Sequence, residues 1–116
     1  MNIELLVVAD CPHEPAAADL LRAALSGLGL PPEGFRTTVI TNEQEAMRRA
    51  FTGSPTFLIN GIDPFAEPDR PVGLSCRIYR HDGIASGLPQ PEALIDALTC
   101  TAAHARPATT TEGRPR

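Results

Sequence analysis

The chain has 116 residues and a formal net charge of −4 at pH 7. This length fits one domain with a single hydrophobic core. All ten basic residues are Arg, and residues 1–104 hold seven of them against thirteen acidic residues. Because a surface that neutralises phosphates needs clustered positive charge, this balance excludes nucleic acid as an expected partner.

The N-terminus and the cysteine content indicate the compartment. The first ten residues, MNIELLVVAD, carry no basic leader and only a short apolar run, so no secretion signal is expected. No stretch approaches the length that crosses a membrane. Three cysteines are too few for a disulfide scaffold, and in a reducing compartment catalytic or metal-binding roles outrank structural bridges. We therefore expect a soluble, cytoplasmic protein.

The first predicted elements are a strand and a helix. Residues 3–9, IELLVVA, form a nearly continuous apolar run that favours a buried strand. Pro12 suits the first turn of a helix, where its missing N–H costs nothing, and this would make Cys11 the N-cap. A helical apolar stripe follows, and glycines end it. The stripe comprises Ala17, Leu20, Leu21, Ala24, Leu25 and Leu28, and the glycines are Gly27 and Gly29.

A second strand and a second helix follow. Residues 35–40, FRTTVI, are rich in β-branched residues and predict a strand. Asn42 begins a capping box with Glu45 three residues later, which marks the start of a helix. The helix is expected to end at Gly53 and to direct four of its side chains toward the core. These are Ala46, Met47, Ala50 and Phe51.

The third strand is followed by a long loop and a fourth strand. Residues 54–61, SPTFLING, place a proline before a short apolar strand that ends at an Asn-Gly turn. Residues 62–74 hold three prolines and no clear period, and so long a loop in a small domain is typically functional or mobile. Residues 75–80, SCRIYR, alternate between two faces and predict an edge strand. Cys76 and Ile78 share one face, and Arg77 and Tyr79 share the other.

A turn at residues 81–83 leads to the last helix, which begins at Pro91. Its inner face carries Leu94, Ala97, Leu98 and Thr101. Cys100 lies on the opposite side and is expected to face water. Residues 105–116 are polar and unpatterned, so we expect a disordered tail after a domain of residues 1–104. The order is β-α-β-α-β-β-α, an α/β sandwich whose first two strands are parallel.

Three features of this order resemble the thioredoxin-like superfamily. Cys11-Pro12-His13 lies between the first strand and the first helix, at the place of that family's active-site motif. Ser54-Pro55-Thr56 precedes the third strand, at the place of its cis-proline. The element order is the same from residue 1 to about residue 101. The resemblance implies a thioredoxin-like β-α-β-α-β-β-α sandwich with a central mixed sheet. The chain departs from the motif at Glu14, where a second cysteine would stand, and at Asp10, where an aromatic residue is frequent.

A narrower resemblance covers two local stretches. GSPTFLINGIDPF and LSCRIYR are similar to a group of small bacterial thioredoxin-like proteins, some of which are labelled alkylmercury lyases. This resemblance implies thiol chemistry on a soft metal or an organomercurial as an alternative function.

Cys11 is the candidate nucleophile. At a helix N-cap its sulfur would face unpaired N–H groups and the positive end of the helix dipole, which favour the thiolate. A protonated His13 would add to this, whereas Asp10 and Glu14 would oppose it. Glu14 has two interpretations: it closes a capping box with the Cys11 backbone at N3, or it exchanges a proton with the thiol. The structural alternative is that Cys11 is a small apolar residue at a strand end.

The resemblance implies a substrate-binding role for a second set of residues and a cis peptide bond before Pro55. These residues are Pro12, His13, Ser54, Pro55 and Thr56. A cis bond would leave the backbone of Ser54 exposed beside the thiol, free to pair with an extended substrate. The alternative is an ordinary trans proline that begins an edge strand.

Cys76 is the candidate partner of Cys11, provided that the fold brings their Cα atoms within about 7 Å. The alternative is a strand cysteine packed in the core. No Cys-x-x-Cys pair and no phosphate-binding loop is present, so neither a zinc site nor another cofactor is expected. Two thiolates that lie close together would suit a soft, thiophilic ion.

The predicted function is therefore thiol–disulfide exchange on a protein or low-molecular-weight substrate. Cys11 would attack, and Cys76 or an external thiol would resolve the mixed disulfide. Two alternatives stay open. One is soft-metal or organomercurial chemistry at the two thiols. The other is a non-catalytic thioredoxin-fold module that binds a protein partner through residues 62–74.

Overall fold

The structure is a computed structural model that describes residues 2–67 and 69–105. Within these residues the chain forms three α-helices and five β-strands. They are β1 (Ile3–Val8), α1 (Glu14–Gly27), β2 (Arg36–Ile40), α2 (Glu43–Arg48), β3 (Thr56–Ile59), β4 (Tyr79–His81), β5 (Ile84–Ser86) and α3 (Pro91–Ala105). The predicted alternation of strands and helices is confirmed up to β3. The prediction of a single strand between β3 and the last helix is wrong, because the chain turns back at residues 82–83 and forms a second strand, β5.

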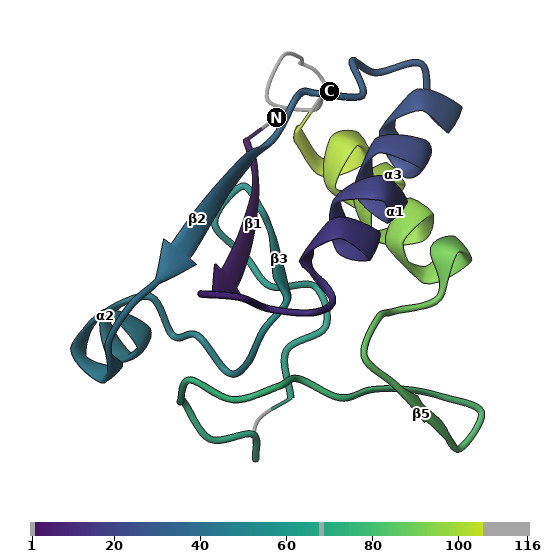
Figure 1. The fold of residues 1–116 in the computed structure, drawn as a ribbon. Coiled ribbons are helices and arrows are strands. Elements are labelled where there is room, and N and C mark those ends of the chain that lie inside the picture. Colours follow the sequence, from purple (N-terminus) through teal and green to yellow (C-terminus); the bar gives the residue numbers. More distant parts are fainter. Residues whose placement is uncertain (1, 68, 106–116) are drawn as a thin grey trace.

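Three of these strands form the central sheet, in the order β2-β1-β3. β1 pairs in parallel with β2, as predicted, and places Leu6 opposite Thr38. It pairs antiparallel with β3 and places Leu5 opposite Phe57. Figure 1 shows α1 and α3 together on one side of this sheet and α2 on the other. The chain is therefore a mixed α/β fold in which helices flank both faces of a three-stranded mixed sheet.

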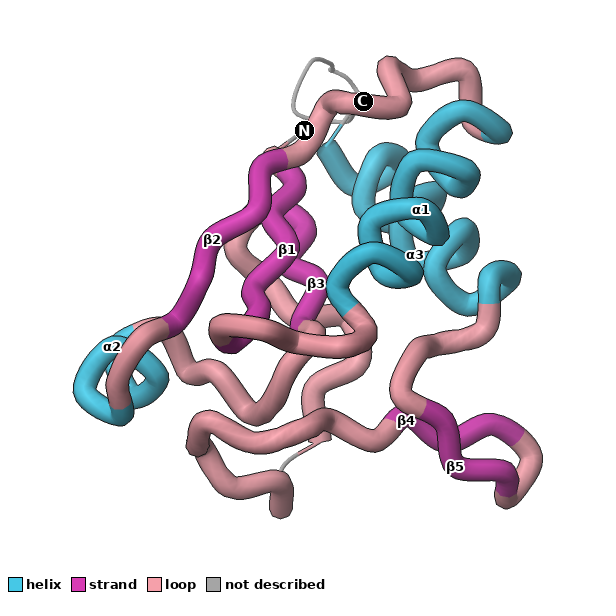
Figure 2. The backbone as a smooth tube through the Cα atoms, in the orientation of Figure 1, coloured by secondary structure: helices cyan, strands magenta, loops and turns pink. Residues whose placement is uncertain are grey.

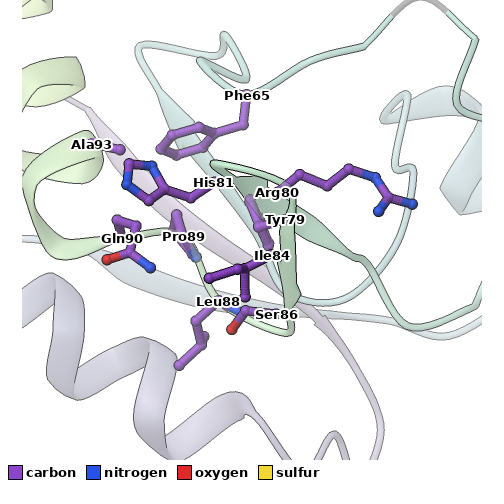
Figure 3. A pocket seen from close by; sticks show the side chains of 10 residues that line it. All are labelled: Phe65, Tyr79, Arg80, His81, Ile84, Ser86, Leu88, Pro89, Gln90 and Ala93. Carbon is purple, nitrogen blue, oxygen red and sulfur yellow. The ribbon is translucent and has the colours of Figure 1, made fainter.

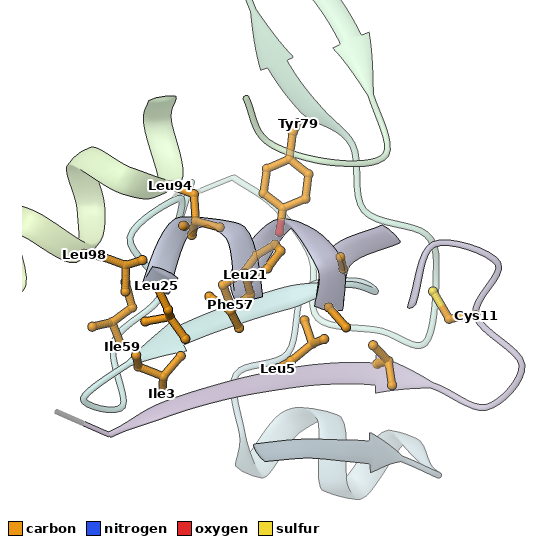
Figure 4. Close-up of a cluster of buried hydrophobic side chains, with 14 residues drawn as sticks. Ile3, Leu5, Cys11, Leu21, Leu25, Phe57, Ile59, Tyr79, Leu94 and Leu98 are labelled. Carbon is orange, nitrogen blue, oxygen red and sulfur yellow. The ribbon is translucent and has the colours of Figure 1, made fainter. Parts of the chain in front are cut away.

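β1 is apolar at nearly every position because both of its faces are covered. Ile3, Leu5 and Val7 belong to the larger core, which β1 and β3 share with α1 and α3 (Figure 4). Leu6 belongs to a smaller core on the α2 side. Other members of the larger core are Ala17, Ala18, Leu21, Ala24, Leu25, Phe57, Ile59, Tyr79, Leu94 and Leu98. The smaller core adds Ile40, Ala46, Phe51 and Leu58.

The one acidic residue of β1 is buried. The Glu4 carboxylate accepts hydrogen bonds from Thr38 Oγ1 and Arg49 Nη2, both at 2.6 Å, and Arg36 Nε lies 3.6 Å from it. Burial by itself raises the pKa of this carboxyl. The hydrogen bonds from Thr38 and Arg49 and the charges of both arginines outweigh burial, and the pKa of Glu4 lies below its ordinary value. The ionised carboxylate thus ties β1 to β2 and to the end of α2.

The predicted helix boundaries are confirmed where local capping chemistry defines them. The Asn42 side chain accepts the Glu45 N–H at 2.8 Å and caps α2. α1 ends at Gly27, and Gly29 takes a left-handed conformation with φ of 74° just beyond it. Only glycine adopts such a conformation without steric cost, so the apolar stripe of α1 stops there.

The inner face of α2 differs from the prediction. The helix ends at residue 48, and Ala50 takes a positive φ of 51°. Of the four residues predicted to point inward, only Ala46 and Phe51 are buried. Met47 is 71% exposed and Ala50 also faces solvent, so the prediction that all four residues point inward is wrong.

The predicted edge strand over residues 75–80 does not extend the sheet. β4 pairs instead with β5, as a hairpin that stands apart from the three-stranded sheet (Figure 2). The predicted alternation is nevertheless confirmed, since Arg77 and Tyr79 are buried whereas Cys76 and Ile78 are exposed. In the described part of the chain, the backbone of residues 75–77 pairs only with Ser54, just before β3, and the buried Arg77 side chain finds its partners in the preceding loop and on β3.

α3 closes the larger core and carries the predicted inner face, since Leu94 and Leu98 are fully buried. Cys100 is exposed, as predicted. The helix continues to Ala105, the first residue assigned to the tail, and the remainder of the predicted disordered tail lies outside the described residues. Within residues 2–67 and 69–105, the helices are too short or too polar to cross a bilayer.

Candidate functional site

Cys11 lies just beyond the end of β1. Asp10 adopts a positive φ of 58°, and the chain turns there from the sheet toward α1. Cys11 is only 6% exposed and belongs to the larger core. Figure 4 shows it beyond the end of β1, apart from the aliphatic side chains at the centre of the cluster. Its sulfur therefore lies at the edge of the packed interior.

The helix begins later than predicted. His13, not Cys11, is the N-cap of α1, and Pro15 instead of Pro12 lies in its first turn. Glu14 is the first helical residue, and its N–H donates to the Cys11 carbonyl at 3.2 Å. The predicted N-cap role of Cys11 is therefore wrong. The capping box with Glu14 at N3 is wrong for the same reason, because Glu14 stands at N1.

Ser54 provides a polar contact to Cys11. Its Oγ lies 2.9 Å from Cys11 Sγ and accepts a hydrogen bond from the Val8 N–H at 3.1 Å. Ser54 is fully buried. Because the amide donates into a lone pair of Oγ, the hydroxyl hydrogen is left to donate to the sulfur. A hydrogen-bond donor stabilises negative charge on its acceptor, so this contact supports the nucleophilic form of Cys11.

The peptide bond between Ser54 and Pro55 is cis, as expected. The backbone of Ser54, however, is already paired within the chain. Its N–H donates to the Ser75 carbonyl at 2.8 Å, and its carbonyl accepts the Arg77 N–H at 3.0 Å. The expectation that the Ser54 backbone is free for a substrate is therefore wrong, because residues 75–77 occupy the position of an added strand.

The same pairing sets Cys76 directly opposite Ser54. Ser54 is thus the common neighbour of both cysteines: its hydroxyl contacts Cys11 and its backbone lies beside Cys76. Cys76 is exposed, so the alternative of a cysteine packed in the core is wrong. Both Cys11 and Cys76 are thiols in the structure. A dithiol of this kind can lose two electrons as an internal disulfide and regain them from an external thiol.

The other predicted site residues have different surroundings. Pro12 is exposed, and His13 is partly buried with its ring against the backbone of Gly87. A Cβ at Gly87 would lie 2.5 Å from the His13 Nε2. Thr56 is buried, and its hydroxyl donates to the Gly53 carbonyl at 2.6 Å. The structure thus places Ser54 in contact with Cys11 and in a backbone pairing with Cys76, whereas His13 packs against the loop before α3.

Sequence reasoning missed the residue that holds Cys76 in place. The Arg77 side chain is fully buried and pairs with Asp63 through both terminal nitrogens, at 2.6 and 3.4 Å. Its Nη2 also donates to the Phe65 carbonyl at 2.6 Å, and its Nη1 donates to Thr56 Oγ1 at 3.2 Å. The sequence placed Arg77 on the same face as Tyr79, but an arginine that pairs with an acid in a distant loop has no local signature.

Tyr79 connects this anchor to the cis peptide. Its hydroxyl donates to the Pro55 carbonyl at 2.6 Å, and the Arg77 guanidinium lies 4.7 Å from the centre of its ring. Burial raises the pKa of the Tyr79 hydroxyl well above its ordinary value, so the group keeps its proton and remains a donor. Edge-to-face contacts with Phe57 and Phe65 complete an aromatic cluster beneath the loop.

A small hollow that does not include the thiols lies between the β4–β5 hairpin and the start of α3 (Figure 3). Its volume is about 60 Å³, well below the roughly 300 Å³ at which ligand pockets begin. Tyr79, His81 and Gln90 are among its lining residues, whereas Cys11, Ser54 and Cys76 are not. It is therefore too small to hold a substrate for the thiols.

The part of the chain that the structure describes holds no group of three or more His, Cys, Asp or Glu residues arranged to bind a metal ion. In comparisons with known proteins, the chain matches no protein-family model, no curated protein and no solved structure. The functional proposal therefore depends on the contact between Ser54 and Cys11 and on the pairing between Ser54 and Cys76.

Proposed function

We propose that this protein is a thioredoxin-like thiol–disulfide exchange protein in which Cys11 attacks and Cys76 resolves. One observation carries the proposal: Ser54 donates a hydrogen bond to Cys11 Sγ at 2.9 Å and pairs through its backbone with the segment that carries Cys76. The order of β1, β2 and β3, the thiol after β1 and the cis-proline before β3 agree with the arrangement that the resemblance implies.

The reaction would run in two steps. The Cys11 thiolate attacks one sulfur of a substrate disulfide, the substrate S–S bond breaks, and the departing thiolate takes a proton from water. The Cys76 thiolate then attacks the Cys11 sulfur of the mixed disulfide and releases the second substrate thiol. The protein loses two electrons and ends with a Cys11–Cys76 disulfide, while the substrate disulfide becomes two thiols. An external low-molecular-weight thiol restores the reduced protein.

The roles of the flanking groups follow from their contacts. The Ser54 hydroxyl stabilises charge on Cys11 before attack, and again when an external thiol attacks the Cys76 sulfur of the internal disulfide and Cys11 departs. Cys76 is exposed, so its sulfur is open to reagents in solvent. The donor at Ser54 marks Cys11 as the attacking thiol, and the exposed Cys76 is assigned the resolving role.

The test uses bis(2-hydroxyethyl) disulfide as the oxidant and mass spectrometry as the measurement. The wild-type protein should lose two hydrogens and yield a Cys11–Cys76 linked peptide. Cys76→Ser should stop at a stable mixed disulfide on Cys11, and Cys11→Ser should consume the oxidant far more slowly. Cys100→Ser, which alters an exposed cysteine on α3, is the matched control and should behave as wild type. Wild-type consumption of the oxidant by Cys11→Ser would refute the role of Cys11.

The same arrangement of two thiols favours a second candidate, the binding or transfer of a soft, thiophilic metal or organometal. Two thiolates suffice for a two-coordinate soft ion, although a site with three or more ligands is absent from the described residues. Titration with mercuric ion distinguishes the candidates. One equivalent bound by both Cys11 and Cys76, in a protein that fails to reduce disulfides, would favour the metal function.

A further inference from the structure

We infer that this site takes low-molecular-weight disulfides and excludes extended peptide chains, an inference that rests on the proposed thiol–disulfide exchange at Cys11. An extended peptide binds beside a strand or a cis-proline by pairing with free backbone groups, and this pairing supplies most of its affinity. At Ser54 both groups are taken, because the N–H is bonded to Ser75 and the carbonyl to Arg77.

The occupying segment follows the chain beside it over several residues. The Gly73 N–H donates to the Phe51 carbonyl at 3.1 Å, and the two bonds at Ser54 continue the same pairing. Residues 73–77 therefore run alongside residues 51–54, the stretch that leads into the cis-proline. A peptide substrate would have to displace this segment before it could reach the backbone next to Cys11.

The segment is anchored from its buried side. Arg77 is held by Asp63, by the Phe65 carbonyl and by Thr56, and Asp63 itself is only 15% exposed. Gly53 packs so closely against the segment that a Cβ there would lie 2.9 Å from Arg77 Cβ and 3.0 Å from its Cα. Lifting the segment would break a buried ion pair, which is costly because it leaves an unpaired charge away from water.

Small disulfides differ from peptides because their reaction does not require pairing with the Ser54 backbone. Cys11 is 6% exposed and Cys76 is exposed, and residues 75–77 already occupy the strand edge at Ser54. A short, flexible disulfide needs only a line of approach to the sulfur and no backbone partner. It can therefore react while residues 73–77 stay in place.

The decisive experiment compares two symmetric disulfides on the wild-type protein. One is bis(2-hydroxyethyl) disulfide, and the other is the disulfide-linked dimer of an eight-residue unstructured peptide with cysteine at position four. Each rate is divided by the rate at which free glutathione reduces the same compound, which removes differences in intrinsic reactivity. The normalised rate for the peptide should be lower by about tenfold or more. Equal normalised rates would overturn the inference, and no reaction with either compound would instead refute the proposed function.

Two variants test whether the anchored segment is the cause. Asp63→Asn removes the charge that holds Arg77, and it should raise the peptide rate by about tenfold while the small-disulfide rate changes by less than about twofold. Glu67→Gln is the matched control, because it breaks the Arg70 ion pair of the same loop but leaves Asp63 intact. It should change neither rate.

Circular dichroism verifies that each variant is folded, and Arg77→Lys gives the same test if Asp63→Asn unfolds. A folded variant that loses the anchor but still discriminates against the peptide would overturn the assignment.

Discussion

Replacing Ser54 with Ala separates two effects of one hydroxyl. The substitution removes the donor to Cys11 Sγ at 2.9 Å and the acceptor of the Val8 N–H at 3.1 Å. A hydrogen bond to a charged acceptor contributes about 1.5–3 kcal/mol. Losing a contribution of this size at the attacking sulfur should slow alkylation of Cys11 by about 10- to 150-fold. Leaving the buried Val8 amide without a partner costs a further ~1–3 kcal/mol of folding free energy.

The assay is the rate of alkylation of Cys11 by iodoacetamide across a pH series, in Cys76→Ser, Cys100→Ser protein so that one thiol is observed. Ser54→Ala should be alkylated more slowly than the matched wild-type background, and its urea midpoint should fall. Ser75→Ala is the matched control, because Ser75 is exposed and its backbone carbonyl, which accepts the Ser54 N–H, is unchanged by the substitution. A Ser54→Ala profile that coincides with wild type would refute the inference that the hydroxyl stabilises charge on the sulfur.

Three further predictions concern the groups that support the site. Gly53→Ala should cost about 1–3 kcal/mol in urea unfolding, because Gly53 has a φ of 133° and a Cβ would meet Arg77. Gly73→Ala is the control, because a Cβ there meets nothing within 4 Å, and it should lower the unfolding free energy by less than about 0.5 kcal/mol. Equal losses of unfolding free energy in the two variants would contradict the close contact between Gly53 and Arg77. Arg77→Leu should lower the unfolding free energy by about 3–5 kcal/mol, since it leaves Asp63 nearly buried and unpaired; a loss below about 1 kcal/mol would mean that the pair is not formed. The pKa of Glu4 is lower in the folded protein than the value of about 4.3 expected in the unfolded chain. Ionised Glu4 therefore stabilises the fold fully above that pH, and this stabilisation is lost as the pH falls through the folded pKa. Glu4→Gln should therefore show a smaller loss of unfolding free energy than wild type on acidification below about pH 4.3.

The elements that were predicted well are those with a local cause. Both faces of β1 are covered, and its run of apolar residues already indicated this. The cap at Asn42 is a contact between residues three apart, and the apolar stripe of α3 is a helical period. Each of these signals lies within a few consecutive residues, so no knowledge of the tertiary structure is needed to read it.

The start of α1 was misjudged for a related reason. Two prolines lie close together, and either one fits the first turn of a helix. The structure selects Pro15, and Asp10 takes the positive φ that turns the chain. Cys11 therefore stands in a turn before the helix. The polar neighbour of Cys11 is Ser54, which lies after α2 and 43 residues from Cys11 in the sequence.

The sequence by itself determined the alternating elements up to β3 and the position of a thiol after the first strand. The cis bond before Pro55 was expected from the resemblance, and the structure contains it. The tertiary structure alone decided what surrounds that thiol. Residues 75–77 pair with Ser54 because Arg77 finds an acid and a carbonyl in the preceding loop and a hydroxyl on β3. A buried charge is stable only where all such partners converge, and that convergence depends on contacts between distant residues, which no local pattern encodes.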